Sequence, residues 1–179
     1  MAFPTVVLAE KSIAVFPGWS VPEKGSGAVW FDAPLEIGGV VEPGLVLHGT
    51  ALLYAPDCNV ALELVARGTL TRKRIPLTRI DWRSLRGGHS NQRGRNCGEW
   101  SRVRVGHTHI HPFDMNWVVQ EERMRGVNLP CAKPIDRALH TFEDVSAYSG
   151  KELRINNIDI VTRPKWDYDL FDERVDWNE

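Results

Sequence analysis

The first half of the chain is a succession of short segments rich in β-branched and aromatic residues, separated by turns that contain glycine and proline. The segments are 4–9, 12–16, 28–31, 35–41, 45–54 and 59–66. Short segments of this composition, bounded by turn residues, are typical of β-strands. Their even spacing favours antiparallel hairpins over βαβ units. The sequence therefore predicts a β-rich antiparallel sheet, built as a meander or a half-barrel.

Helical patterns occur only in the second half. Residues 134–148 place apolar side chains on one helical face, residues 114–126 do so more weakly, and 153–163 resemble a last strand. We therefore expect an α+β fold, with one or two helices of the C-terminal half packed on the sheet. A chain of 179 residues is long enough for one domain with a full core. Its expected parts are a β-rich half (1–111), a helix-containing half (112–164) and an acidic tail (165–179).

Hydropathy and cysteine placement indicate the compartment. The sequence has no apolar run of membrane-spanning length, and its first residues lack the basic leader of a secretory signal. The three cysteines, Cys58, Cys97 and Cys131, are odd in number and widely spaced. This pattern argues against a disulfide scaffold and for a reducing compartment. We expect a cytoplasmic protein that has no membrane partner.

The net charge of −1 conceals two segments of opposite charge. Between Arg67 and Arg104 there are eleven Lys or Arg against Asp81 and Glu99, a net of +9. Residues 165–179 carry six acids against two basic residues, a net of −4. The basic segment 67–104 is a candidate surface for nucleic acid or a nucleotide. The alternative is that both segments are solvated faces whose charges pair with each other.

Three of the six histidines recur at every second position in GHTHIHPF, residues 106–113. In a strand, alternate side chains share one face, so His107, His109 and His111 would point in the same direction. A row of imidazoles at the end of a strand is the best candidate for an active site in this sequence. A bulge at Gly106 would instead turn the histidines outward and leave a solvated row.

Other polar residues upstream are candidate partners of these histidines. Arg79, Asp81 and Arg83 share one face of a strand-like segment whose other face is apolar. In one interpretation Asp81 orients a histidine while the arginines hold an anion; in the other the charges pair on an exposed strand. His89 and Asn91 follow in a long polar loop, and loops of that length are often functional or disordered.

These motifs together resemble an uncharacterised group of bacterial and phage-associated proteins. The matching elements are Arg79-Ile80-Asp81-Trp82, His89-Ser90-Asn91, His109-Ile110-His111-Pro112-Phe113, Asn116 and Leu129-Pro130. The resemblance covers residues 77–160 and extends loosely to the N-terminal half. It implies that His109 and His111 are the functional pair of the histidine row, and it implies no activity.

The first functional hypothesis is a phosphodiester- or nucleotide-directed hydrolase, ribonuclease-like, that works by histidine acid–base chemistry without a metal. One imidazole would accept a proton from the nucleophile and another would donate one to the leaving oxygen. The candidate catalytic residues are His109, His111, His89, Asp81 and Arg79. The candidate substrate-binding residues are Asn91, Arg83, Asn116 and His107.

Two further hypotheses use the same residues. Same-face Cα atoms of a strand are about 6.6 Å apart, so His109 and His111 can converge on one Zn or Fe ion. His89 or Asp81 would then be the third ligand of a metal-dependent hydrolase, whereas all three histidines of the row span about 13 Å and cannot converge. The remaining hypothesis is a non-catalytic module that binds nucleic acid or another anion through the basic segment.

Overall fold

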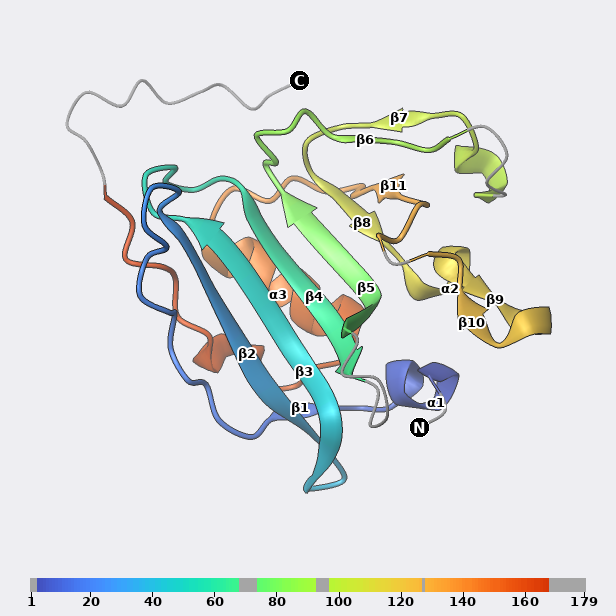
Figure 1. Cartoon of the computed structure of the whole chain (residues 1–179), viewed down its shortest axis with the longest axis horizontal. Coiled ribbons are helices and arrows are strands. Elements are labelled where there is room, and N and C mark those ends of the chain that lie inside the picture. Colours follow the sequence, from blue (N-terminus) through green and yellow to red (C-terminus); the bar gives the residue numbers. More distant parts are fainter. Residues whose placement is uncertain (1–2, 68–73, 93–96, 127, 168–179) are drawn as a thin grey trace.

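The computed structural model describes residues 3–67, 74–92, 97–126 and 128–167. Its main element is one seven-stranded sheet with the order β1-β2-β3-β4-β5-β8-β11, in which every pair of neighbours is antiparallel (Figure 1). The predicted α+β fold, with an antiparallel sheet and its longest helix in the C-terminal half, is confirmed.

The strands of the main sheet are β1 (Ser12–Ile13), β2 (Ala28–Ile37), β3 (Val40–Leu52), β4 (Val60–Arg67), β5 (Arg74–Trp82), β8 (His109–His111) and β11 (Lys133–Pro134). Two small ribbons join β6 (His89–Ser90) to β7 (Arg104–Val105) and β9 (Trp117–Val118) to β10 (Arg123–Met124). The helices are α1 (Phe3–Leu8), α2 (Phe113–Asn116) and α3 (Phe142–Leu153), with 3-10 turns at Gly98–Trp100, Val119–Glu121 and Ile158–Ile160.

One face of the sheet forms the hydrophobic core. Leu62, Ile80 and Ile110 lie side by side on β4, β5 and β8 and are fully buried. Helix α3 lies behind the sheet in Figure 1, and its buried Phe142 and Val145 belong to the same core. Burial of this apolar face is the main term that stabilises the fold.

The opposite face of the same strands carries a polar row. Asp32, His48, Glu63, Arg79 and His111 are direct cross-strand neighbours on β2, β3, β4, β5 and β8. Because side chains alternate between the two faces, the row follows from the same registers that bury the core. The candidate site lies at the β5–β8 end of this row.

Several local predictions are wrong, and tertiary pairing accounts for them. Residues 4–9 fall largely in helix α1, and residues 114–126 contain only one helical turn followed by the β9–β10 ribbon. The helix expected at 134–148 begins at Phe142, because Lys133–Pro134 pairs with β8 and the Thr141 capping box starts the helix later. Residues 153–163 form turns and a 3-10 helix.

The segment 101–111 is not one strand. It divides into β7, which pairs with β6, and β8, which pairs with β5 and β11. The pairing partner therefore changes around Gly106, and His107 lies between the two strands. Of the three histidines in residues 106–113, only His109 and His111 belong to the main sheet.

The cysteine pattern argued against disulfides, but the structure contains one. Cys97 and Cys131 form a disulfide across 34 positions of sequence, and the thiol of Cys58 is buried and donates to the carbonyl oxygen of Ala55 at 3.5 Å. Tertiary structure brings the pair together, which sequence spacing could not indicate. No helix in the described ranges is long and apolar enough to cross a membrane. Arg72, Lys73, Arg93 and Arg95 of the basic segment, and 168–179 of the acidic tail, lie outside those ranges.

Candidate functional site

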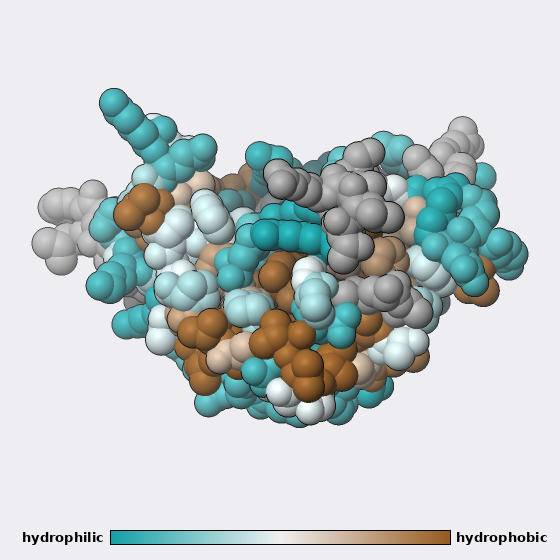
Figure 2. All heavy atoms as spheres, turned by 60° about the horizontal axis from the view of Figure 1, so that its bottom comes forward, coloured by the Kyte–Doolittle hydropathy of each residue, from teal (hydrophilic) through white to brown (hydrophobic). Residues whose placement is uncertain are grey.

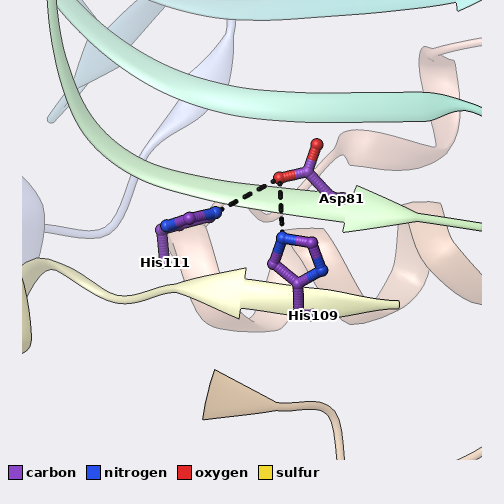
Figure 3. A group of neighbouring side chains, drawn as sticks. All are labelled: Asp81, His109 and His111. Carbon is purple, nitrogen blue, oxygen red and sulfur yellow. Dashed lines mark ion pairs between the residues drawn. The ribbon is translucent and has the colours of Figure 1, made fainter. Parts of the chain in front are cut away.

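The pairing of β5 with β8 assembles the site. Arg79 lies opposite His111, and Asp81 lies opposite His109, on the polar face of the sheet. Figure 3 shows both imidazoles directed from β8 toward the carboxylate on β5. Asp81, His109 and His111 are each about 95% or more buried. The site is therefore inside the protein, although it lies on the polar face.

One carboxylate oxygen faces both histidines. Oδ2 of Asp81 is 3.5 Å from Nε2 of His109 and 3.5 Å from Nε2 of His111. The ring centroids of the two histidines are 5.0 Å apart. One candidate ligand atom from each of the three residues lies within 4.8 Å of the others. A single ion placed among them would reach all three.

Backbone carbonyls determine which nitrogen of each histidine carries hydrogen. Nδ1 of His109 is 2.8 Å from the carbonyl oxygen of Gly106, and Nδ1 of His111 is 2.7 Å from that of Leu129. A carbonyl oxygen only accepts, so both Nδ1 atoms must donate. In the neutral imidazole Nε2 is then a lone-pair acceptor. Where the imidazoles are neutral, both histidines present acceptors to a carboxylate that is itself an acceptor.

The other carboxylate oxygen is held by an arginine. Oδ1 of Asp81 accepts hydrogen bonds from Nε of Arg79 at 3.0 Å and from its Nη2 at 2.5 Å. Burial by itself opposes ionisation, but contact with His111 and the charge of Arg79 outweigh it and lower the pKa of Asp81 to about 2. Burial lowers the pKa of His109 to about 4, against the attraction of Asp81. The carboxylate is thus ionised and His109 is neutral at pH 7.

His89 lies beside this cluster. Its ring centroid is 4.6 Å from that of His111 and 6.0 Å from that of His109. Nε2 of His89 donates to the carbonyl oxygen of Pro130 at 2.9 Å, which leaves Nδ1 as the acceptor. Burial is the main cause that lowers the pKa of His89. A neutral imidazole next to the cluster can accept a proton there.

The main chain of residues 129–132, here called the 129–132 segment, anchors these side chains. It accepts the hydrogen bonds of His111 and His89 through Leu129 and Pro130. The amide of Asn116 bonds both N–H and C=O of Cys131 at 2.9 and 2.8 Å, and Asn91 does the same for Ala132 at 2.8 and 2.7 Å. The Cys97–Cys131 disulfide adds a covalent link to the 129–132 segment.

The remaining predicted residues lie outside the cluster. Asn91 and Asn116 were predicted to bind substrate, but their side-chain amides form hydrogen bonds with the main chain of the 129–132 segment. Nδ1 of His107 donates to the carbonyl oxygen of Ser84 at 2.7 Å, and its side chain is exposed. The guanidinium of Arg83 stacks on Trp82 and donates to the carbonyl oxygen of Asp57. Arg79, Asp81, His89, His109 and His111 are the predicted residues that the fold brings together.

A cavity of about 410 Å³ opens on the polar face of β3, β4 and β5. Its lining residues are His48, Thr50, Ala61, Glu63, Arg74, Pro76, Arg79, Asn128 and Leu129. The cavity borders the cluster through Arg79 and Leu129, which form hydrogen bonds with Asp81 and His111. In the view of Figure 2, hydrophilic residues occupy the central hollow of the surface.

Sequence reasoning missed Glu63 as part of the site, included Arg74 only in the basic segment 67–104, and noted Leu129-Pro130 only as an element of the family resemblance. Glu63 lies in an apolar strand segment, between two leucines, and this isolated acid was the one feature of the sequence that could have indicated its role. The backbone carbonyls of Leu129 and Pro130 have no side-chain signature at all. Comparison with protein-family models, with curated proteins and with solved structures finds no match to this chain.

Proposed function

We propose that Asp81, His109 and His111 bind one divalent metal ion, Zn or Fe, and that the protein is a metal-dependent hydrolase of phosphoesters or nucleotides. The observation that carries the proposal is the convergence of three candidate ligand atoms, Oδ2 of Asp81 and Nε2 of each histidine, within 4.8 Å of one another, while both Nδ1 atoms donate to backbone carbonyls.

In the neutral tautomers of the histidines, the lone pairs of these three atoms face one another in a mostly buried site. Lone pairs in that arrangement repel each other, and the repulsion is stronger where water is excluded. A divalent ion would give each lone pair a partner. Two imidazoles and one carboxylate are a common ligand set for Zn and for Fe(II), and such a set leaves coordination positions open for substrate or water.

The hydrogen bonds behind the ligands support the same assignment. Metal-binding histidines commonly donate their second ring nitrogen to a backbone carbonyl or a carboxylate, which fixes the tautomer and the ring orientation. His109 and His111 both do so, to Gly106 and Leu129. Arg79 binds the carboxylate oxygen of Asp81 that points away from the histidines. Each of the three candidate ligands is thus oriented by a second group.

The groups around the cluster fit hydrolysis. A bound divalent ion would polarise a phosphoryl oxygen and lower the pKa of water. His89, neutral and adjacent, would accept the proton of the attacking water. The side chain of Arg79 is 44% exposed while its guanidinium binds Asp81, so it would also contact the negative charge that develops on the substrate.

A second candidate is the metal-free reaction, in which two histidines act as acid and base. The 4.6 Å separation of the rings of His89 and His111 favours it, because both imidazoles would reach one substrate. Asp81 would then orient His111 and stabilise its protonated form. This candidate uses the same residues, and metal analysis separates the two.

The test is metal content combined with turnover, on protein purified without a histidine tag. We expect about one Zn or Fe per chain in wild type, and none in His109→Ala. His107→Ala is the matched control, because it removes a histidine of the same motif that lies outside the cluster. Hydrolysis of phosphoesters or nucleotides should stop on chelation and return with Zn or Fe. Turnover that persists in metal-free protein would reject the metal proposal and favour the acid–base alternative.

A further inference from the structure

We infer that the 410 Å³ cavity is the substrate pocket of this centre, and that it takes a small hydroxylated anion rather than a polymer. This inference rests on the proposed function, since it names the substrate class of the same site. The cavity has the size of small-molecule sites in proteins, which run from about 300 to 1,000 Å³.

The cross-strand register places the pocket next to the cluster. Glu63 is the direct neighbour of Arg79 on one side and of His48 on the other, so the three side chains form a line from β5 to β3. The strands β3 and β5 are two strand spacings apart, about 10 Å. A ligand whose reacting group lies at Asp81 and the histidines would extend along this line, with its far end at His48.

The hydrogen-bond donors at the cavity favour an anionic ligand. The side chains that line the cavity include two arginines, Arg74 and Arg79, and one acid, Glu63. Within the described part of the chain, Arg74 pairs with Glu63 through Nη2, and Arg79 binds Asp81 through Nε and Nη2. The other N–H groups of both guanidiniums are therefore available to a phosphate or carboxylate, whose geometry they match.

His48 gives the far end of the pocket a different chemistry. Its Nδ1 lies 2.7 Å from Oδ1 of Asp32, and a carboxylate accepts, so Nδ1 donates. Nε2 of His48 is then an acceptor at the cavity wall. An acceptor there, with the hydroxyl of Thr50 beside it on the same strand, suits a ligand hydroxyl group. The pocket thus combines an anion end at the arginines with a hydroxyl end at His48.

Calorimetric titration of the wild-type protein with ribose 5-phosphate, gluconate and ribose tests the inference. Ribose 5-phosphate and gluconate separate a phosphate from a carboxylate as the anionic group, and ribose lacks both. We expect at least one of the two anions to bind about tenfold or more tightly than ribose. A single-stranded RNA oligonucleotide that binds while neither anion does would overturn the inference.

Two variants locate the binding. The double change Glu63→Gln with Arg74→Gln removes an ion pair as a unit, so neither charge is left buried alone. It should weaken the binding of the anion about tenfold. Arg123→Gln, which removes an arginine paired with Glu121 on the surface, is the control and should leave binding unchanged. Thermal unfolding verifies that both variants fold. Equal anion affinity in wild type and the double variant would refute the assignment of the pocket.

The titrations distinguish failure of the pocket from failure of the metal centre. Arg74 and His48 contact neither Asp81 nor the histidine pair in the described hydrogen bonds, so anion binding should persist, weakened, in chelator-treated protein. Anion binding without any metal content would leave the pocket standing and reject the proposed metal. Metal content without anion binding would support the metal centre and reject the pocket.

Discussion

Replacement of Asp81 by asparagine is the sharpest perturbation of the cluster. Asparagine has nearly the same shape, and its carbonyl oxygen can still accept from Arg79 as Oδ1 of Asp81 does. Its NH₂ group would take the place of Oδ2, which is 3.5 Å from Nε2 of each histidine. In the metal-free protein the variant therefore supplies the donor that these two acceptors lack.

The magnitudes follow from those contacts. The new hydrogen bonds would each contribute about 0.5–1.5 kcal/mol. Loss of the carboxylate charge acts in the opposite direction, because the depressed pKa of Asp81, about 2, corresponds to roughly 2 kcal/mol in favour of the charged form in the fold. The free energy of unfolding of metal-free Asp81→Asn should accordingly lie close to that of metal-free wild type. The variant loses the anionic ligand, however, and we expect its metal affinity to fall about 100-fold or more.

Thermal unfolding measures both effects in one experiment. Metal at 100 times its Kd stabilises a folded protein by about 2.7 kcal/mol, which raises the Tm of a chain of this size by about 5–10 °C. We expect that shift on adding Zn or Fe to chelator-treated wild type and to the control Asp159→Asn, whose side chain is exposed. Asp81→Asn should show no shift.

Two results would contradict this reasoning. A full metal-induced shift in Asp81→Asn would show that the carboxylate is not a ligand. A marked loss of stability in metal-free Asp81→Asn would show that the histidines are protonated donors in the native state. That second result would support the acid–base alternative, because imidazolium groups need the carboxylate and gain nothing from an amide donor.

Three further predictions follow from the cluster and its anchor. First, metal-free wild type should lose up to about 3 kcal/mol of unfolding free energy as pH falls from 6.5 to 4, because His109, with a folded pKa of about 4, stays neutral while the unfolded chain takes up a proton. Denaturant titrations at several pH values should show that this dependence of the unfolding free energy on pH is lost in His109→Gln. Second, the depressed pKa of Asp81, about 2, contributes stability that is complete above pH 3.8 and declines only as pH falls toward 2, so any acid loss at pH 4–6.5 belongs to histidine. Third, Asn116→Ala removes the hydrogen-bond partner of the buried N–H and C=O of Cys131. It should lower the unfolding free energy by about 2–3 kcal/mol and weaken metal binding. The control Asn156→Ala, at an exposed residue, should change neither quantity.

Reduction of the Cys97–Cys131 disulfide is a separate test of the anchor. The bond closes a loop of 34 positions that ends in the 129–132 segment, and loss of such a link costs about 2–4 kcal/mol. Because Leu129 orients His111, reduction with a dithiol should lower the metal affinity as well as the Tm. Cys58→Ser, which changes the cysteine outside the disulfide, should leave the metal affinity unchanged.

The local sequence determined which residues share a face. Two-residue alternation placed Arg79 with Asp81 and His109 with His111, because successive side chains of any strand point to opposite sides. The predicted segments 45–54 and 59–66 overlap β3 and β4, but the predicted segment 35–41 crosses the turn between β2 and β3, and Pro43-Gly44 lies inside β3. The alternation required no knowledge of which strands are neighbours, and it is confirmed by the sheet.

Tertiary structure decided everything that depends on long-range pairing. The registers that bring Asp81 to His109, and Glu63 to Arg79, join residues far apart in sequence and leave no local pattern. The same holds for the 129–132 segment, which meets the histidines through its backbone. His107, equivalent to its two neighbours by spacing, was excluded only because the strand changes partner around Gly106. Alternation within a strand follows from covalent geometry alone, whereas the choice of partner follows from burial of the whole core.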